Sequence, residues 1–506
     1  MKRASVAGFA VLFALFCAPR PAAAQIVSII VPSSARVAGA NGAFYTTDLS
    51  VANTGATTAA LTLKFLGHDQ DGTAGPERAI TIAPGATVTL DDVLGTVFSE
   101  SSGFGAIRIS SSSQSLVAVA QTSTPGFGGT FGQSVPGFGD HSGLYTAFIR
   151  NGQKRSIVAV REDGAFRTNL VLANATTART DVDVTLVSAD GLNLGSKRYT
   201  LPPLGMTQVS RVVREFGVST DVSSARLDLS TPTTSGQFAA YASSIDNTTN
   251  DPRTLLPISG SGYSPFGYLW WVPSSARASG ANGAFYTTDL TVSNIGTVTE
   301  SFTLQFSSHD QSGGGLPKIP VTVAAGKTVT FVDVLGSVFG QSSAYGALQI
   351  YAAYTSATAG GSSLVFLAET STPGFGGTFG QSVTGVSSSY IITTRPHSIL
   401  GVREDSLFRT NLVLCNDGGS VLPVDVSLVA ADGTVLGSKR YSIPSLGMTQ
   451  VTRVVRDLGV TSDVVGARLA MSTPAVGTGF LAYASVIDNV TNDPRTLLPL
   501  SPYVQY

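Results

Sequence analysis

The sequence predicts an all-β protein of four tandem β-sandwich modules, arranged as two near-copy pairs, each module with at most one short helix. Three observations predict it. Long segments recur in tandem, apolar and polar residues alternate in short runs, and Gly, Pro and Asp mark turns between the runs. The hydrophobic fraction of 43% argues against disorder, because apolar residues in periodic runs can fill several cores.

Three segments of the first half return without change in the second half. NGAFYTTDL at 41–49 recurs at 282–290, TSTPGFGGTFGQSV at 122–135 recurs at 370–383, and NDPRTLLP at 250–257 recurs at 492–499. Each half also holds two related modules, because GAFYTTDLSVAN at 42–53 resembles GAFRTNLVLAN at 164–174. We therefore place the four modules at residues 25–140, 141–262, 263–388 and 389–506.

Period-two alternation identifies the strands within each module. In 60–65 and 181–187 apolar residues alternate with polar ones, which indicates a sheet with one face buried and the other in water. Asp190-Gly191 and Asp432-Gly433 supply the positive φ angles of tight hairpins, and Pro84-Gly85 marks another turn. The pattern favours a sandwich or a barrel.

One short helix is expected in each module. Residues 92–98 place four apolar side chains on one helical face, and the acidic pair Asp91 and Asp92 stands near the start, where it complements the helix dipole. The matching segments are 211–216, 333–339 and 453–458. We expect these helices to close one end of each sandwich.

The first 24 residues have the order of a secretory signal peptide. Basic residues at 2 and 3 precede an apolar run at 4–16 and the small residues Ala22, Ala23 and Ala24. We predict cleavage between Ala24 and Gln25, and a mature chain that is secreted or held in the cell envelope. The bulky Phe16 before Cys17 argues against a lipidated cysteine. No transmembrane segment is expected in the mature chain.

Charge and cysteine content narrow the range of partners. Charged residues make up only 12% of the chain, and removing residues 1–24 takes away positive charges, so a nucleic-acid partner is not expected.

Cys415 is the one cysteine left after cleavage and cannot form a disulfide within its own chain. It stands where the first copy has Ala173, which favours a small buried residue.

The modules resemble the immunoglobulin-like repeats found in tandem in bacterial secreted and surface proteins. The resemblance lies in the strand order and in motifs such as FRTNLVLAN, and it spans nearly the whole mature chain. It implies β-sandwich architecture alone. The paired cysteines and core tryptophan of antibody domains are missing, so no ligand is carried over.

No catalytic constellation is visible. The four histidines, His68, His141, His309 and His397, are scattered, and neither an HExxH nor a GxSxG motif is present. We therefore expect a protein that is not an enzyme. Carboxylates from distant strands could still meet as a glycosidase pair.

Calcium is the one cofactor that the sequence suggests, at two equivalent loops. The candidate ligands are Asp246 and Asp251, and Asp488 and Asp493 in the second copy. The alternative, which we favour, is an Asx turn at each loop. The loop that begins Asp69 and Asp71 is a poorer candidate, because the second copy replaces Asp71 with Ser312.

Aromatic residues are the candidates for ligand or interface contacts. Phe127, Phe131, Phe375 and Phe379 stand in glycine-rich loops, where they could stack on a sugar or partner, cap a sandwich, or brace a neighbouring module. Trp270 and Trp271 replace Ile29 and Ile30 of the first copy. Because adjacent strand residues face opposite sides, we expect one buried Trp and one facing outward, toward a module interface or a glycan.

Two classes of function follow from the sequence. The first is a non-enzymatic exported scaffold or adhesive protein of the cell envelope or extracellular space, with a cell-surface protein or glycan as partner. The alternative is a secreted carbohydrate-binding or carbohydrate-active protein that uses loop aromatics and aspartates. The sequence leaves open whether the modules form a rigid rod or a flexible array.

Overall fold

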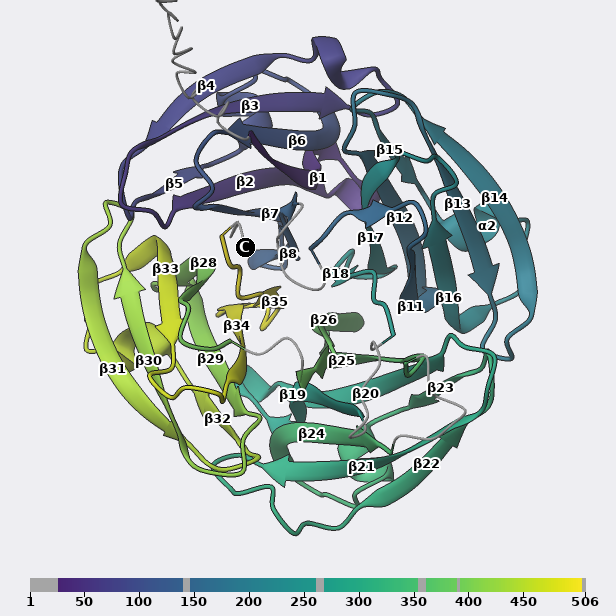
Figure 1. Cartoon of the computed structure of the whole chain (residues 1–506), viewed down its shortest axis with the longest axis vertical. Coiled ribbons are helices and arrows are strands. Elements are labelled where there is room, and N and C mark those ends of the chain that lie inside the picture. Colours follow the sequence, from purple (N-terminus) through teal and green to yellow (C-terminus); the bar gives the residue numbers. More distant parts are fainter. Residues whose placement is uncertain (1–25, 140–145, 261–267, 354–360, 389–391, 503–506) are drawn as a thin grey trace, which may run out of the picture.

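The computed structural model describes residues 26–139, 146–260, 268–353, 361–388 and 392–502. Four groups of antiparallel strands follow one another around a closed ring, and the described chain ends near its centre (Figure 1). The ring is thus neither a rod nor a flexible array. The predicted signal peptide and its cleavage site lie outside the described residues. None of the helices in the described ranges is long and apolar enough to span a bilayer.

The strands of the first copy are as follows. Residues 27–139 hold β1 (Val27–Ala38), β2 (Phe44–Asn53), β3 (Ala59–Gly67), β4 (Glu77–Ile82), β5 (Thr87–Leu90), β6 (Gly103–Ser111), β7 (Leu116–Gly126), β8 (Gly129–Pro136) and β9 (Phe138–Gly139). Residues 149–255 hold β10 (Ile149–Arg150), β11 (Lys154–Glu162), β12 (Phe166–Asn174), β13 (Thr180–Val187), β14 (Asn193–Leu201), β15 (Met206–Val209), β16 (Val222–Ser230), β17 (Gln237–Asp246) and β18 (Pro252–Leu255).

The second copy repeats this order. Residues 268–387 hold β19 (Tyr268–Ser279), β20 (Phe285–Asn294), β21 (Glu300–Ser308), β22 (Ile319–Val323), β23 (Thr328–Phe331), β24 (Ala344–Ala352), β25 (Leu364–Gly374), β26 (Gly377–Thr384) and β27 (Val386–Ser387). Residues 397–497 hold β28 (His397–Glu404), β29 (Phe408–Asn416), β30 (Leu422–Val429), β31 (Val435–Ile443), β32 (Met448–Val451), β33 (Val464–Ser472), β34 (Phe480–Asp488) and β35 (Pro494–Leu497).

Each group of strands forms a two-layered sandwich, so the predicted all-β fold class is confirmed. In the second group, β14-β13-β16-β11 makes one sheet, and β10, β17, β12 and β15, with β18 beside β17, make the other. The fourth group repeats this arrangement. In the first and third groups the layers are one continuous sheet. Strand β1 pairs with β6 from Val27 to Arg36 and with β2 from Arg36 to Ala38, and β19 pairs with β24 and β20 in the same way. We number the groups as modules 1 to 4.

The alternation predicted for 181–187 is present in β13, where every second side chain is buried between the layers. In each module a buried asparagine ends the second long strand. Its side chain binds backbone carbonyl groups at the edge of the core. Asn416 Nδ2 donates to the carbonyls of Ser420, Ile443 and Pro444, and its Oδ1 accepts the N–H of Gly418. Asn53, Asn174 and Asn294 are buried in equivalent networks. A polar side chain is stable here because the loop carbonyls supply its partners.

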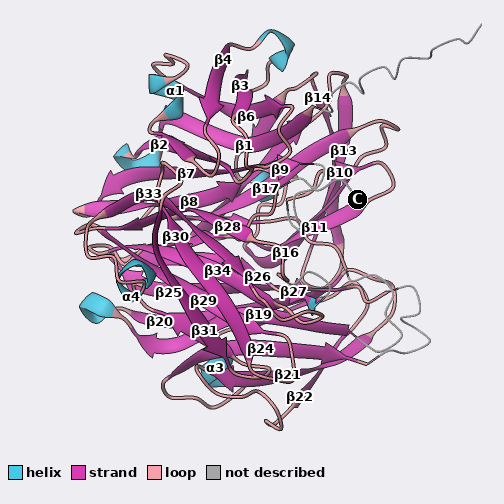
Figure 2. Cartoon of the chain, turned by 60° about the vertical axis from the view of Figure 1, so that its left-hand side comes forward, coloured by secondary structure: helices cyan, strands magenta, loops and turns pink. Residues whose placement is uncertain are grey.

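The four expected helices are present as single turns. They are α1 (Val93–Thr96), α2 (Val212–Glu215), α3 (Val334–Ser337) and α4 (Val454–Asp457). Each begins with two buried apolar residues, and the residue before each has a positive φ. Figure 2 shows α1, α3 and α4 along one side of the molecule. Short 3-10 turns occur at Ala40–Gly42, Gly72–Ala74 and Ala281–Gly283.

Modules of the same copy meet through an apolar interface. Ile30, Phe138, Phe148, Met206 and Tyr241 belong to one buried cluster between modules 1 and 2. The loop after β3 adds polar contacts, because Asp69 donates its N–H to the carbonyl of Met206 and accepts a hydrogen bond from the Thr207 hydroxyl. Asp310 and Thr449 repeat the side-chain contact between modules 3 and 4.

Modules of different copies meet through a second type of interface, which occurs twice and closes the ring. The N–H of Thr328 donates to Ala189 at 2.8 Å, and the N–H of Thr87 donates to Ala431 at 2.8 Å. The first contact joins modules 2 and 3, and the second joins module 4 back to module 1. The predicted Asp-Gly turns, with Gly191 and Gly433 at φ +79° and +91°, stand at the two hairpin ends that make these contacts. The two copies are therefore related by an approximate twofold axis through the centre.

Replacing Asn416 with Ala should lower the free energy of unfolding by about 2–3 kcal/mol, because three carbonyls, of which that of Ile443 is buried, lose their donor. Denaturant unfolding of the mature chain measures this effect. The exposed Asn193→Ala variant is the control and should change the value by less than about 0.5 kcal/mol. Equal stability of the two variants would contradict the structural role of the asparagine.

Candidate functional site at the centre of the ring

The innermost strand of each module lines the central axis. Strand β8 contacts β18 and β35, and β26 also contacts β18 and β35, so these four strands enclose the axis. The segments repeated without change, 122–135 with 370–383 and 250–257 with 492–499, form this centre. We call the four strands and the turns that precede them the hub.

Two phenylalanines occupy the hairpin tips at one end of the hub. Phe127 and Phe375 lie between β7 and β8 and between β25 and β26, and their rings stack with centroids 4.6 Å apart. They are 39% and 54% exposed. Each precedes a glycine, and both residues of each turn have positive φ, the geometry of a two-residue hairpin that normally takes Asn-Gly. A bulky residue with positive φ is strained, and strained residues concentrate at functional sites.

The second pair of phenylalanines lies beneath the first. Phe131 and Phe379 are buried, with ring centroids 6.1 Å apart, and each lies about 6 Å from an exposed tip ring, Phe131 at 5.9 Å from Phe127 and Phe379 at 6.0 Å from Phe375. These two rings brace the diagonally opposite modules 1 and 3. The four candidate phenylalanines therefore form one cluster, with two rings inside and two at the surface.

Asp246 and Asp488 join neighbouring modules with hydrogen bonds. Asp246 Oδ1 accepts the N–H groups of Thr248 and Thr249, which forms an Asx turn, and Oδ2 accepts the N–H and hydroxyl of Thr378 in module 3. Asp488 makes the same contacts with Thr130 of module 1. Hydrogen-bond donors surround these two carboxylates. Asp246 and Asp488, two of the four calcium candidates, therefore accept hydrogen bonds that join neighbouring modules.

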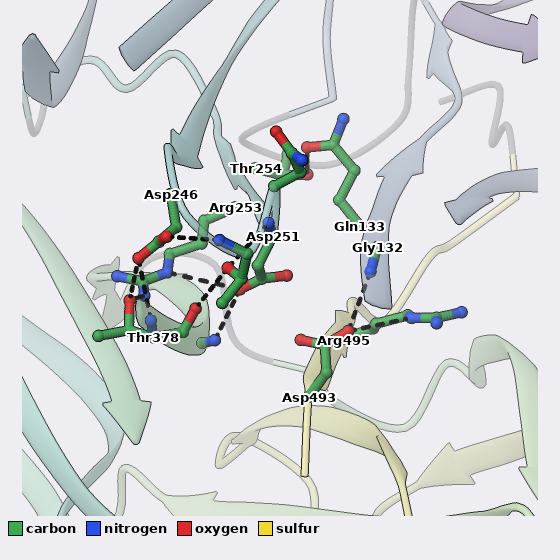
Figure 3. Close-up of polar contacts among 12 residues, drawn as sticks. Gly132, Gln133, Asp246, Asp251, Arg253, Thr254, Thr378, Asp493 and Arg495 are labelled. Carbon is green, nitrogen blue, oxygen red and sulfur yellow. Dashed lines mark hydrogen bonds and ion pairs between the residues drawn. The ribbon is translucent and has the colours of Figure 1, made fainter. Parts of the chain in front are cut away.

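Asp251 and Asp493 meet at the axis, and both are fully buried. Asp251 Oδ2 accepts the N–H of Gly380, and Asp493 Oδ2 accepts the N–H of Gly132, each at 2.9 Å. Figure 3 shows the two carboxyl groups in the hub, with Arg253 and Arg495 following them in the chain. Burial and the facing carboxyl of Asp493 raise the pKa of Asp251 well above its ordinary value, and burial raises the pKa of Asp493 to about 6.

Two small hollows lie along the axis. The first has a volume of about 20 Å³, which is room for about one water molecule. Its lining consists of three residues from each module: 132–134, 252–254, 380–382 and 494–496. The second hollow is bounded in part by Val119, Pro136, Leu256, Leu498 and Leu500. The rest of its lining consists of hydroxyl-bearing residues: Ser134, Thr254, Ser382, Thr384 and Thr496.

The two tryptophans point to opposite sides of β19, and both are buried. Trp270 belongs to the core of module 3. Trp271 lies in the interface with module 4, beside Cys415 and Met448, and its Nε1 donates to Asp417 Oδ1 at 2.6 Å. Burial raises the pKa of Asp417 to about 6. Neither indole is available at the surface.

The described histidines lie apart from the hub. His68 and His309 are half-buried beside Phe104 and Tyr345, and each has Nδ1 at 3.4 Å from the next aspartate. Burial lowers the pKa of His397. His141 lies outside the described residues. In the part of the chain that the structure describes, no three His, Cys, Asp or Glu side chains gather as a metal site.

A carboxylate pair at the interface of modules 2 and 3, with Glu369 buried and Asp289 half-buried, was not found from the sequence. Asp289 lies directly opposite Glu369 in the β20–β25 register, and burial raises the pKa of both. Arg161 and Arg253 act against this rise, and both guanidinium groups lie over the ring of Phe166. At the equivalent interface of modules 4 and 1, Gln121 replaces the glutamate opposite Asp48. The unchanged repeat segments were the one signal in the sequence for this central region.

Comparisons with known proteins leave the family of the chain unassigned. No protein-family model and no curated protein matches it. Among solved structures, the chain is similar to an α-L-rhamnosidase of Streptomyces avermitilis, with 7% identity over 90% of this chain and 55% of that one, and a TM-score of 0.15. It is also similar to the native α-2-macroglobulin of E. coli, with 9% identity over 90% of this chain and 28% of that one, and a TM-score of 0.12. The chain spans about half of the first protein and about a quarter of the second, and neither likeness carries an argument about function.

The Trp271–Asp417 contact should make tryptophan emission pH-dependent. Asp417 ionises with a pKa of about 6, so the emission of the folded protein should change between pH 5 and pH 7. Because this pKa lies above the ordinary value, Asp417 also removes stability as pH rises from about 4 through 6. Fluorescence titration of wild type, Asp417→Asn and the exposed control Asp190→Asn measures the effect. Persistence of the transition in Asp417→Asn would contradict this assignment.

Proposed function

We propose that the protein is a non-enzymatic exported interaction protein of the cell envelope or extracellular space. Its binding surface is the exposed phenylalanine pair, Phe127 and Phe375, at the end of the hub. The observation that carries the proposal is the combination of exposure with a positive φ at both rings. Asn or Gly would adopt each turn without strain, so the turn does not explain why phenylalanine is present. The two aromatic side chains therefore indicate a further role at these positions.

The surroundings of the pair support a role in binding. Phe44 and Phe285, which begin β2 and β20, are also partly exposed. The N–H of Phe44 donates to Thr124 and that of Phe285 to Thr372, in the hairpins that carry the central pair. Arg36 and Arg277 lie over the rings of Phe44 and Phe285. Aromatic and arginine side chains held rigidly are the residue types that dominate protein interfaces.

The proposed export rests on residues 1–24, whose order is that of a signal peptide. A cell-surface protein is the partner class that we favour. A glycan is the second candidate, because paired exposed rings also offer flat apolar faces to a sugar. The non-enzymatic assignment is supported by the carboxylates of the hub, since Asp246, Asp251, Asp488 and Asp493 are buried.

The double variant Phe127→Asn and Phe375→Asn should keep the fold and lose binding. Asn adopts positive φ more readily than Phe, which offsets the lost ring stacking, so the free energy of unfolding should change by less than about 1 kcal/mol. Binding of the labelled mature protein to isolated cell envelopes should weaken at least about tenfold, the 1.4 kcal/mol of one lost aromatic contact.

The matched control is Leu192→Asn with Val476→Asn, which removes two exposed apolar side chains elsewhere on the ring. This control should bind as wild type does. If the phenylalanine variant bound cell envelopes as tightly as wild type does, the proposal would be wrong. Competition by a soluble polysaccharide would identify a glycan, and polysaccharide turnover lost on a single Asp substitution would reject the non-enzymatic assignment.

A further inference from the structure

The two carboxyl groups at the axis leave one oxygen each without an ordinary donor. The Oδ2 atoms of Asp251 and Asp493 accept backbone N–H groups, whereas the buried Oδ1 atoms have no N–H or hydroxyl donor in reach. The carboxyl groups of the two aspartates lie within hydrogen-bonding reach of each other, so each can supply the partner that the other lacks. Two carboxylates cannot satisfy each other, but a carboxylic acid can donate to a carboxylate.

The two arginines beside the pair lie at the Oδ2 atoms of the aspartates, and neither arginine donates a hydrogen bond to an Oδ1 atom. Arg253 Nε lies 4.0 Å from Asp251 Oδ2, and Arg495 Nε lies 3.5 Å from Asp493 Oδ2. Arg253 also donates to Thr378, and the equivalent Arg495 donates to Thr130.

The other titratable groups on or against these turns carry charges of both signs. Asp246 and Asp488 lie on the turns, the hydroxyls of Tyr45 and Tyr286 donate to the carbonyls of Asn250 and Asn492, and Arg167 and Arg409 donate to the side chains of the same asparagines. Strands β8 and β26 present only backbone N–H groups to the pair.

We infer that Asp251 and Asp493 hold one proton between them, and that this shared proton joins the diagonally opposite modules 2 and 4 across the axis of the ring. Each aspartate also holds a module of the other copy through its Oδ2 atom, Asp251 through Gly380 and Asp493 through Gly132. One proton therefore links all four modules at a single point. Its loss would leave two facing negative charges at a fully buried position, which loosens the hub.

The sign of the pH dependence follows from the direction of both pKa shifts. The folded-state pKa values of Asp251 and Asp493 lie above that of an unfolded aspartate, so the contribution of the pair is complete below about pH 4. It declines as the pH rises through 6 and declines further as the shared proton is lost. Each unit between the folded and unfolded pKa weakens the folding equilibrium tenfold.

Infrared spectroscopy of the full mature chain at pH 7 tests for the proton directly. A carboxylic-acid C=O band should be present in wild type and reduced in Asp251→Asn and in Asp493→Asn. Asn donates an N–H to the remaining carboxylate, so the variants replace the shared proton with a permanent donor and should fold. The exposed control Asp190→Asn should leave the band unchanged.

Hydrogen exchange of segments 129–136 and 377–384 between pH 6 and pH 9 tests the consequence. After correction for the intrinsic pH dependence of exchange, wild type should lose protection about tenfold or more, whereas Asp251→Asn should stay level. A band of equal intensity in wild type and both Asn variants would overturn the shared proton. Protection that is independent of pH in wild type would overturn its role in joining the modules.

Discussion

Ring closure is the constraint on which the rest of the structure depends. The last module must reach the first, and it does so with the contacts that module 2 makes to module 3, as Ala431 to Thr87 and Ala189 to Thr328. Each copy therefore offers two complementary surfaces, one at its start and one at its end. Two copies satisfy both surfaces because the rotation between them closes, whereas any other angle would leave an apolar interface open to water.

Ring closure requires the innermost strands of the four modules to pack closely in the hub. The four strands approach closely, and a Cβ at Gly380 of β26 would lie 2.8 Å from Arg253 Nε of β18. Charged side chains are buried here. Each of the four aspartates accepts a backbone N–H across a module boundary, and Arg253 and Arg495 lie beside Asp251 and Asp493. Such ionic networks add little net stability but penalise every misaligned arrangement, so they favour one register of the ring. Arg253 and Arg495 lie over the rings of Phe166 and Phe408. These contacts connect the hub to the interfaces between copies.

The sequence predicted much of the fold and little of the site. Alternation in 181–187, the Asp-Gly turns and the single helical turns are local patterns, so they could be predicted without knowing which modules touch. The ring could not, because closure depends on rotations between modules that no local pattern records. Asp251 and Asp493 were considered as calcium ligands of separate loops, since the sequence places them far apart. Trp271 was expected to face outward from its module, and the partner that covers it comes from module 4.

Packing inside the hub positions the proposed binding surface. Phe131 and Phe379 fill the hub, which fixes the hairpins, and the fixed hairpins hold Phe127 and Phe375 at the surface in a strained turn. The account requires a closed ring in solution, and small-angle X-ray scattering of the mature chain tests this most directly. A compact particle of this length has a radius of gyration of about 23 Å, which is the value that closure predicts. A much larger radius, with the elongated distance distribution of modules joined end to end, would contradict it.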